Sequence, residues 1–431
     1  MQKNKLSVNL QKFEKNNGKI SRTIQFNGSQ LIGEISSKGV GNLKPETGWF
    51  ISLLRGNESK WVTKNKGKLR ILDMFSGAGG LSLGAAEAAK AAGWDYKFEA
   101  AMDVDETALK VHNRNLGTKL LIRRDIQELV DYQLWKTTKG LEFSYPPEPI
   151  HELEQLTGRV DLILAGPPCQ GHSNLNNYTR REDDRNRFYL TVPAVAAAVG
   201  ASLVIIENVQ TVLQDAHNVA EHTKSLLETM GFYVTDLHSS VLSADSFGVA
   251  QKRRRHFLVA SRYKTPPLNE LANAIKTKHI TALQAFRGLP DISKKSFFNK
   301  DADLSLDNQS RVNYLHDNGI YNLPNQERPY CHKNGHTYPS VYGRIYPDRP
   351  ANTITTGFLS PGRGRYVHPT QRRGLTPHEA ARLQGFPDSF KFETSPGKKL
   401  ENKSSYSKLI GDAVPPLLGF VPTLAALLTV E

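Results

Sequence analysis

The sequence has very little cysteine and no clustered set of metal-ligating residues. Its two cysteines, Cys169 and Cys331, are too few for a disulfide framework, which indicates a reducing compartment. Neither belongs to a CxxC motif or to a Cys/His cluster, so we expect no structural zinc and predict no metal site.

Long apolar runs are also absent, and acidic residues are fewer than basic ones. No stretch of about 18 apolar residues occurs, so we expect no transmembrane helix. The first residues are too polar for a secretory signal, and we expect a cytoplasmic protein that binds no membrane. Lys and Arg total 56 against 42 Asp and Glu, a net charge of +14. This excess favours a polyanionic partner, most simply nucleic acid, over a solvated basic surface without a partner.

The segment from Val160 to Asn174 organises the chain. Residues 160–165 are apolar except for Asp161, which is typical of a strand buried on both faces of a parallel sheet. A Gly-Pro-Pro turn ends this strand at Pro168, and Cys169 follows where doubly wound α/β folds bind ligands. Cys169 is therefore a candidate nucleophile. The alternative, a small buried core residue, fits the polar residues that follow it less well.

A second ligand-binding pattern follows the strand predicted over 69–75. The segment 76–80 is a glycine-rich turn before a helix, which lets backbone N–H groups approach a ligand. The spacing is not GxGxxG, which counts against a dinucleotide site. The next strand, 98–104, carries Asp103 near its end, where an acid can accept hydrogen bonds from both ribose hydroxyls. Asp105 is expected to cap the following helix.

Further polar side chains follow other predicted strands. A strand over 120–126 carries Asp125, which could meet an adenine amino group or cap a turn. A buried strand over 202–209 carries Glu207, for which a salt-bridged carboxylate is the simpler interpretation. The last strands are predicted over 234–242 and 256–260, with a basic cluster at 251–255 before the final one.

The chain is long enough for about two or three domains. We expect a basic N-terminal extension over 1–67, with short strands at 23–26 and 49–54 and no assigned chemistry. Residues 68–261 are expected to form the main α/β domain, completed by a C-terminal helix within 405–431. Residues 262–404 are expected to form a smaller domain, and the alternating basic and aromatic residues within 262–345 suit a loop-rich surface that contacts phosphates and bases. The polar stretch 174–187 is expected to be a mobile lid beside Cys169.

Several segments, in order as well as in kind, resemble the cytosine carbon-5 DNA methyltransferases of the bacterial modification type. They are DMFSGAGGLSLG at 73–84, GPPCQGHSN at 166–174 with DRNRF at 184–188, ENV at 207–209, QKRRRHF at 251–257, RPANTITT at 349–356, LTPHEAARLQGFPDSF at 375–390 and GDAVPP at 411–416. The resemblance implies a Rossmann-like, S-adenosylmethionine-dependent methyltransferase domain and a smaller, loop-rich target-recognition domain at 262–404.

The resemblance also implies a reaction, in which carbon 5 of a flipped-out cytosine in a specific duplex DNA sequence is methylated. Cys169 would add to carbon 6, and a protonated Glu207 would donate to ring nitrogen 3. Arg255 would contact the pyrimidine oxygen, and the charges of Arg255 and Arg253 would favour the thiolate. The products would be methylated DNA and S-adenosylhomocysteine. A cognate restriction endonuclease is an expected partner, and we expect a monomer in the bacterial cytoplasm.

Family resemblance places the cofactor residues as well. Phe75 would flank the adenine, Asp103 would bind the ribose hydroxyls and Asp125 would meet the adenine amino group. The methionine portion would be wrapped by Ser76, Gly77, Ala78, Gly79, Gly80 and Leu81. Further cofactor contacts are predicted for Val104, Ile126, Pro168, Asp412 and Ala413. The family usually has Asn-Ser at the last two positions, so the contact made by this part of the tail is left open.

Other activities remain as alternatives. The related tRNA methyltransferase usually carries a Cys-Phe-Thr tripeptide late in the chain, which does not occur here. Cys331, in PYCHKN, does not fit the second catalytic cysteine of other RNA cytosine methyltransferases. An inactive DNA-binding relative is disfavoured by the intact Cys169, Glu207 and Arg255, and a nicotinamide dehydrogenase by the glycine spacing.

Overall fold

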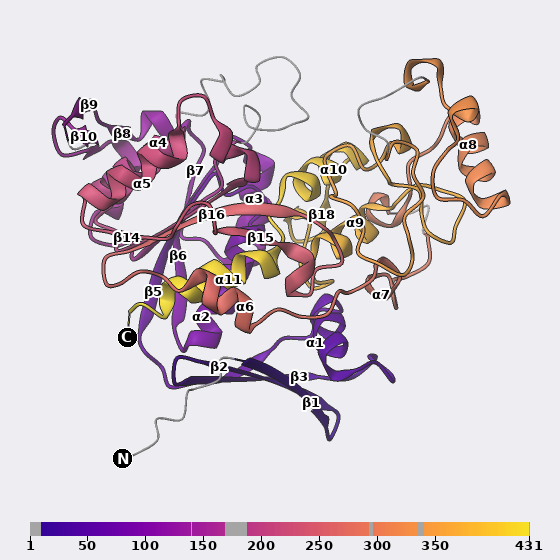
Figure 1. The fold of residues 1–431 in the computed structure, drawn as a ribbon, viewed down its shortest axis with the longest axis horizontal. Helices are drawn as coiled ribbons and strands as arrows, with labels where there is room; N and C mark the ends of the chain where they lie inside the picture. Colours follow the sequence, from indigo (N-terminus) through magenta and orange to yellow (C-terminus); the bar gives the residue numbers. More distant parts are fainter. Residues whose placement is uncertain (1–9, 139, 169–187, 293–295, 334–339, 431) are drawn as a thin grey trace.

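A twisted central sheet organises the molecule (Figure 1). The computed structural model describes residues 10–138, 140–168, 188–292, 296–333 and 340–430. The strands of the sheet are β5 (Lys68–Met74), β6 (Asp95–Met102), β7 (Leu120–Ile122), β12 (Leu162–Ala165), β13 (Leu203–Val209), β14 (Tyr233–Val234), β15 (Val241–Ser243) and β16 (Arg254–Ser261). Their order is β14-β16-β13-β12-β5-β6-β7, with β15 also paired to β16. The strands from β7 to β13 run parallel and β16 is antiparallel to β13, which confirms the predicted mostly parallel α/β fold.

Helices cover both faces of this sheet (Figure 1). They are α2 (Gly80–Ala92), α3 (Glu106–Leu116), α4 (Phe188–Val199), α5 (Val219–Thr229), α6 (Leu268–Ala274) and α11 (Pro416–Leu427). One hydrophobic cluster joins α2, α6 and α11 to the sheet, and another joins α4 and α5 to it. Adjacent strand residues point to opposite faces, so Ile71 belongs to the first cluster and Leu72 to the second. The predicted packing of the C-terminal helix on the large domain is confirmed.

Two of the predicted strands are wrong in extent. Residues 234–242 are not one strand, because a turn in which Ser239 N–H donates to Asp236 separates β14 from β15. The strand predicted over 120–126 ends at Ile122, and Asp125 instead caps the short 3-10 helix η1 (Ile126–Glu128) by accepting from Gln127 N–H. In both segments a polar side chain satisfies local backbone donors and so competes with the sheet ladder.

Smaller elements connect these strands. Between η1 and β12 lie β8 (Val130–Asp131), β9 (Leu134–Thr137), β10 (Gly140–Phe143), β11 (Glu148–Pro149) and η2 (His151–Leu156). β9 pairs with β10 and β8 pairs with β11, both antiparallel. Elsewhere in the domain, η4 (Gln210–Gln214) follows β13 and η5 (Ala244–Phe247) precedes β16.

The N-terminal segment forms a packed unit of its own secondary structure. Strands β1 (Leu10–Asn16), β2 (Lys19–Phe26), β3 (Ser29–Ser36) and β4 (Lys60–Val62) make an antiparallel sheet in that order. Residues 49–54, predicted as a strand, belong instead to helix α1 (Pro45–Leu54), which starts with a proline in its first turn. A short apolar run does not distinguish a buried strand from a buried helix, and burial of Trp49 and Phe50 is compatible with both.

The segment from 262 to 404 is rich in loops and short helices. Its elements beyond α6 are α7 (Ala282–Ala285), η6 (Phe297–Asn299), α8 (Leu306–Asp317), η7 (Asn325–Glu327), η8 (Tyr330–His332), η9 (Pro361–Arg363), α9 (Pro377–Gln384), β17 (Glu393–Ser395), β18 (Lys398–Lys399) and the start of α10 (Lys403–Asp412). α8 has a small hydrophobic cluster around Val312 and Leu315, whereas α9 and α10 share a larger cluster with α1. The domain boundaries at 262 and 404 stay a prediction.

One apolar stretch meets the length and composition of a membrane span among the described residues. It covers Lys403–Leu427, and 89% of its most apolar window is buried inside the protein. The stretch is also interrupted at residues 413–415, between α10 and α11. Burial of this kind is typical of a core helix, because its apolar side chains already pack against α2 and the sheet.

Candidate active site at the carboxyl edge of the sheet

The glycine-rich turn between β5 and α2 exposes the start of a helix. Phe75, Gly77 and Gly79 all have positive φ angles, of 56°, 51° and 90°, and Gly79 is the N-cap of α2. No side chain caps α2 within the described part of the chain. Its first N–H groups therefore remain available to a polar or anionic group such as the carboxylate of an amino acid. Ser76 Oγ is buried and has no hydrogen-bond partner among the described residues, which leaves an acceptor and donor for a ligand.

Part of the C-terminal segment lies directly against this turn. A Cβ atom on Gly80 would stand 2.2 Å from Val414 O, and one on Gly84 would stand 2.0 Å from Pro416 O. These contacts bring Asp412 and Ala413, just before them in the chain, close to the turn. The exposed Asp412 side chain approaches Lys408, whose Nζ lies 3.4 Å from Asp412 Oδ2 and 3.2 Å from Asp105 Oδ2.

Asp103 links the end of β6 to the same turn. Its Oδ2 accepts from Gly77 N–H at 2.8 Å and its Oδ1 accepts from Asp105 N–H at 2.9 Å. Burial raises the pKa of Asp103, although these two backbone hydrogen bonds oppose the effect. Asp105 caps α3 by accepting from Thr107 N–H and Ala108 N–H, as predicted. Beside Asp103, the apolar Val104 is 65% exposed, as expected of a surface that a flat apolar ligand would cover.

The remaining predicted adenine residues border this region. Phe75 is half-buried and its ring stacks edge-on against Phe188, with centroids 5.6 Å apart. Ile126 is buried, and Asp125 is occupied as the cap of η1, which is one of the two roles that its position allows. The orphaned Ser76 hydroxyl, the open helix start and the exposed Val104 together fit an adenosine with an amino-acid side arm.

A second polar group lies where β13 and β16 pair. The antiparallel register places Val209 opposite Arg255, and Arg255 Nε lies 2.8 Å from Glu207 Oε1. Glu207 is only 7% exposed. Burial raises the pKa of Glu207, and the positive charges of Arg255 and Arg253 only partly oppose this. A raised pKa favours the protonated form of this carboxyl, which is the form that can donate a proton to a substrate.

The turn after β12 joins the two polar groups. A Cβ atom on Gly166 would stand 3.8 Å from Glu207 Oε2 and 3.9 Å from Phe75 O. Pro168, two residues further, is half-buried and ends the described part of this turn. Cys169 and the predicted lid at 174–187 lie outside the described residues. The carboxyl ends of β5, β12 and β13 therefore meet at one place, the switch point of the strand order.

Arg253 has different neighbours from those expected of a residue that faces a thiolate. Its side chain is buried, and its Nη1 and Nη2 groups donate to Ile354 O at 2.8 Å and to Gly411 O at 3.3 Å. The guanidinium thus joins β16 to the RPANTITT segment and to α10. Its charge still acts on Glu207 across the interior.

Sequence reasoning missed several buried polar groups around the site. Beneath the glycine turn, His112 Nε2 lies 3.3 Å from both Asp73 Oδ2 and Ser82 Oγ, and Thr118 Oγ1 lies 3.0 Å from His112 Nδ1. This network joins β5, α2 and α3. Asp73, an acid flanked by apolar residues in ILDM, was the available signal for it.

Tyr189, in the first turn of α4, was also missed. Its hydroxyl is buried and has no partner among the described residues. Burial and the nearby charge of Glu207 raise the pKa of Tyr189. No feature of the helical sequence 188–199 distinguished it from a core residue.

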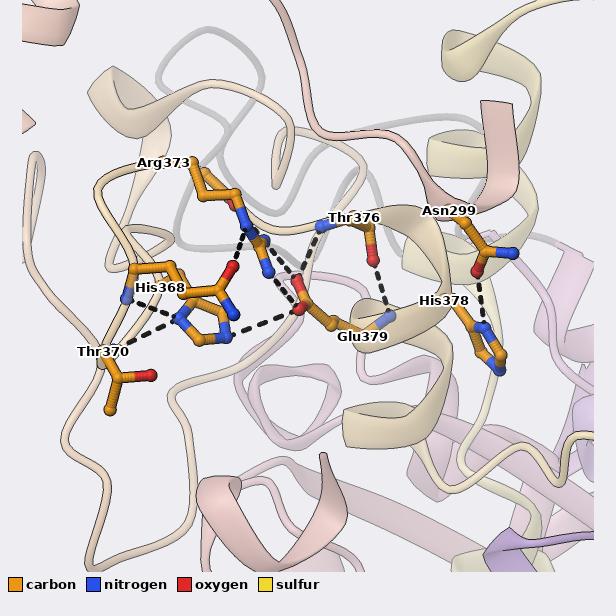
Figure 2. Close-up of polar contacts among 9 residues, drawn as sticks. Asn299, His368, Thr370, Arg373, Thr376, His378 and Glu379 are labelled. Carbon is orange, nitrogen blue, oxygen red and sulfur yellow. Dashed lines mark hydrogen bonds and ion pairs between the residues drawn. The ribbon is translucent and has the colours of Figure 1, made fainter. Parts of the chain in front are cut away.

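A buried polar network holds α9, the helix of the LTPHEAARLQGF segment (Figure 2). Arg373 donates from Nη1 to Glu379 Oε2 at 2.8 Å and from Nη2 to Glu379 Oε1 at 2.6 Å. His368 Nδ1 accepts from the backbone N–H groups of Thr370 and Gln371, so the ring proton is on Nε2, 3.4 Å from Glu379 Oε1. Thr376 and Glu379 also form the capping box of α9, and the predicted helix cap is thereby confirmed.

Gln251 joins this helix to the active-site edge. Gln251 Nε2 donates to Gln384 Oε1 at 2.8 Å, and its Oε1 accepts from Ile354 N–H at 2.6 Å. Gln384 Nε2 in turn donates to Ile410 O. The segments at 251–257, 349–356, 375–390 and 411–416 are thus joined by hydrogen bonds between buried groups, including those of Arg253.

Comparison with known proteins gives consistent results. The family described as C-5 cytosine-specific DNA methylase matches residues 69–421. The Bacillus subtilis Type II methyltransferase M1.BsuMI is 39% identical over 357 residues, covering 83% of this chain and 80% of that protein. Type II methylase M.HgiDII of Herpetosiphon aurantiacus is 26% identical, covering 81% of this chain and 93% of that protein.

Solved structures show the same fold. A protein described as a DNA modification methyltransferase encoded within a prophage of E. coli has a TM-score of 0.52 at 22% identity, covering 83% of this chain and 98% of that chain. The S. pombe Dnmt2 methyltransferase has a TM-score of 0.53 at 18% identity, covering 82% of this chain and 96% of that chain. At these identities the likeness concerns the fold alone.

Proposed function

Because the chain belongs to the C-5 cytosine-specific DNA methylase family, we propose that the sheet edge described above is where it methylates DNA. The protein is a DNA cytosine-5 methyltransferase of the restriction–modification type. Its methyl donor is of the S-adenosylmethionine type.

The donor in this proposal is S-adenosylmethionine, and the product is S-adenosylhomocysteine. When bound, S-adenosylmethionine supplies an electrophilic methyl group on a sulfonium. The N–H groups at the start of α2 and the hydroxyl of Ser76 would hold its amino-acid arm. Asp103 would accept from the ribose hydroxyls, and Phe75 and Val104 would flank the adenine. The remaining proposed contacts are those of Gly77, Ala78, Gly79, Gly80, Leu81, Asp125, Ile126, Pro168, Asp412 and Ala413.

Cys169 is the proposed nucleophile. Carbon 5 of cytosine is a poor nucleophile until the thiolate adds to carbon 6, which converts the ring into an enamine. A protonated Glu207 would donate to ring nitrogen 3 as sulfur adds, so that negative charge does not accumulate on the ring. Its burial supports this role, since burial favours the neutral carboxyl. Carbon 5 then takes the methyl group, a base removes the carbon-5 proton, and elimination releases the sulfur.

The two arginines have separate roles in this proposal. Arg255, 2.8 Å from Glu207, would orient the carboxyl and contact the pyrimidine oxygen. Arg253 would stabilise the thiolate by its charge while its N–H groups join the segments around Ile354 and Gly411. The target cytosine must leave the duplex to reach these groups, at a cost of a few kcal/mol that contacts to DNA offset.

The observation that carries the proposal is the approach of Gly166 both to Glu207 and to the glycine-rich turn. It brings the turn that leads to Cys169 beside the acid and beside the donor site. We further propose that the protein acts as a cytoplasmic monomer and that a restriction endonuclease acts on the same DNA site.

Labelled methyl transfer from S-adenosylmethionine tests the proposal, with unmethylated duplex DNA and tRNA as separate acceptors. We expect transfer to DNA, at carbon 5 of cytosine, and its loss in Cys169→Ala. Transfer to tRNA alone, DNA binding without transfer, or activity that survives Cys169→Ala would each contradict it. A fluorinated cytosine in the target should trap a covalent adduct at Cys169.

A further inference from the structure

The N-terminal unit, residues 10–62, precedes the part of the chain that matches the family, residues 69–421. It is nevertheless an integral part of the folded protein. Trp49, Phe50 and Ile51 of α1 are buried in the same hydrophobic cluster as α9 and α10. Ile24 and Phe26 of β2 belong to the cluster of α2 and α11. One face of this small unit therefore packs on both halves of the protein.

Its first set of contacts fixes it to the helices behind the donor site. Trp61 Nε1 donates to Glu87 Oε1 of α2 at 2.9 Å, and Ser59 Oγ bonds to the same oxygen. The Arg22 guanidinium lies over the ring of Phe420 in α11, 5.3 Å from its centroid. α2 begins at the glycine-rich turn and α11 packs against α2, so the unit is tied to the framework of the turn.

A second set of contacts reaches the segment 262–404, the proposed target-recognition domain, both at residues 275–278 just after α6 and at Asp388 after α9. Gln11 Nε2 donates to Ile275 O at 2.6 Å and to Lys276 O at 3.0 Å. Lys278 N–H donates to Glu46 Oε1 at 2.7 Å. Asp388 N–H, just after α9, donates to Leu54 O at 2.8 Å. Figure 1 shows β1, β2, β3 and α1 lying below both α2 and α7.

We propose that residues 10–62 form a brace that holds the target-recognition segment in register with the donor site, and that Gln11 and Glu46 are its positioning residues. The inference rests on the proposed function. Domains joined by a short connection move relative to one another unless an interface fixes them. A flipped base must reach the nucleophile and the donor within a fraction of an ångström, so such motion would weaken productive DNA binding.

The test uses the full chain with Gln11→Ala and Glu46→Ala together. This pair removes the three hydrogen bonds to residues 275–278 and the 3.2 Å hydrogen bond from Arg22 Nε to Gln11 Oε1, and it leaves the Trp61–Glu87 contact intact. We expect KM for unmethylated duplex DNA to rise roughly tenfold, since a hydrogen bond of this kind changes an equilibrium by up to about tenfold. KM for S-adenosylmethionine should stay within about twofold. Glu46→Gln should behave as wild type, because its amide oxygen can still accept from Lys278 N–H.

Glu34→Gln is the matched control. Glu34 belongs to the same unit, but it pairs with Lys19 within the N-terminal sheet and touches neither α2 nor residues 275–278 in the contacts described. An unchanged KM for DNA in the double variant would overturn the inference. So would an equal rise in both KM values, or an equal effect of Glu34→Gln.

Hydrogen exchange separates this inference from the proposed function. In the double variant the amide of Lys278 should exchange faster, and those of β5 and β6 should not change. This result does not depend on methyl transfer. If the wild-type protein methylates no DNA, the proposed function fails while exchange still tests the brace. Unchanged exchange at Lys278 would reject the brace even in a fully active enzyme.

Discussion

Glu379→Gln should destabilise the protein by about 3 kcal/mol at neutral pH, because it breaks the buried ion pair between Glu379 and Arg373. The glutamine keeps an oxygen that can accept from Thr376 N–H, so the capping box survives. It loses the second acceptor for Arg373, whose side chain is only 9% exposed. Removing one partner of such a pair costs roughly 3–5 kcal/mol, because the other charge stays buried.

The titration of Glu379 gives a similar magnitude. Burial alone would raise its pKa, but hydrogen bonds from Arg373 and His368 hold the pKa at about 2 instead of the ordinary 4.5. A shift of that size corresponds to about 3 kcal/mol, at about 1.4 kcal/mol for each pKa unit. Because the folded-state pKa is depressed, this stability is present above pH 4.5 and is lost as the pH falls towards 2.

Urea unfolding at several pH values measures both effects. The difference in free energy of unfolding between wild type and Glu379→Gln should be constant from pH 7 to about 5.5 and should shrink below that. Glu228→Gln, on the exposed face of α5, should change stability by less than about 0.5 kcal/mol. Adding Arg373→Met to Glu379→Gln should recover part of the loss, since both charges are then removed. A loss below about 1 kcal/mol at pH 7, or one that does not vary with pH, would refute the reasoning.

Three further predictions concern the active site. Glu207→Gln should lower methyl transfer at least about 100-fold. It should also raise the melting temperature at pH 7, because burial raises the pKa of Glu207 in the folded state, so the carboxyl ionises more readily in the unfolded chain and the fold loses stability as the pH rises above 4.5. Normal activity, or a lower melting temperature, would contradict this. Gly80→Ala places a Cβ 2.2 Å from Val414 O, so it should lower the free energy of unfolding by about 1–3 kcal/mol. It should also weaken S-adenosylmethionine binding measured by calorimetry, whereas Lys90→Ala on the same helix should not. Asp103→Asn should raise KM for S-adenosylmethionine about tenfold and leave KM for DNA unchanged, since it removes one of the two carboxylate oxygens that accept from the backbone N–H groups of Gly77 and Asp105. Equal changes in both constants would count against a cofactor role.

Much of the main domain could be predicted because its signals are local. The continuous apolar runs of β5, β12 and β13 follow from burial on both faces of a parallel sheet. The glycine-rich turn and the α9 cap are set by residues close together in sequence. These features placed the ends of the strands, and therefore the candidate site, at one edge of the sheet.

The features that sequence did not predict depend on distant contacts. Residues 49–54 form a helix because Trp49 and Phe50 pack against segments far along the chain. Arg253 donates to carbonyl groups more than a hundred residues away, which neither charge nor spacing reveals. In the sequence, His112 looks like any polar residue of an amphipathic helix. Its role follows only from the fold, in which β5 places Asp73 beside it.

The order in which the chain is synthesised gives α11 a particular importance. This helix covers one face of the sheet, yet residues 93–415 are translated between it and its neighbour α2. Until α11 has left the ribosome, the apolar side of α2 and of the first strands lacks a large part of its cover and is open to aggregation. Expression yield should therefore depend on chaperones that shield nascent chains, and premature termination before Pro416 should leave an insoluble product.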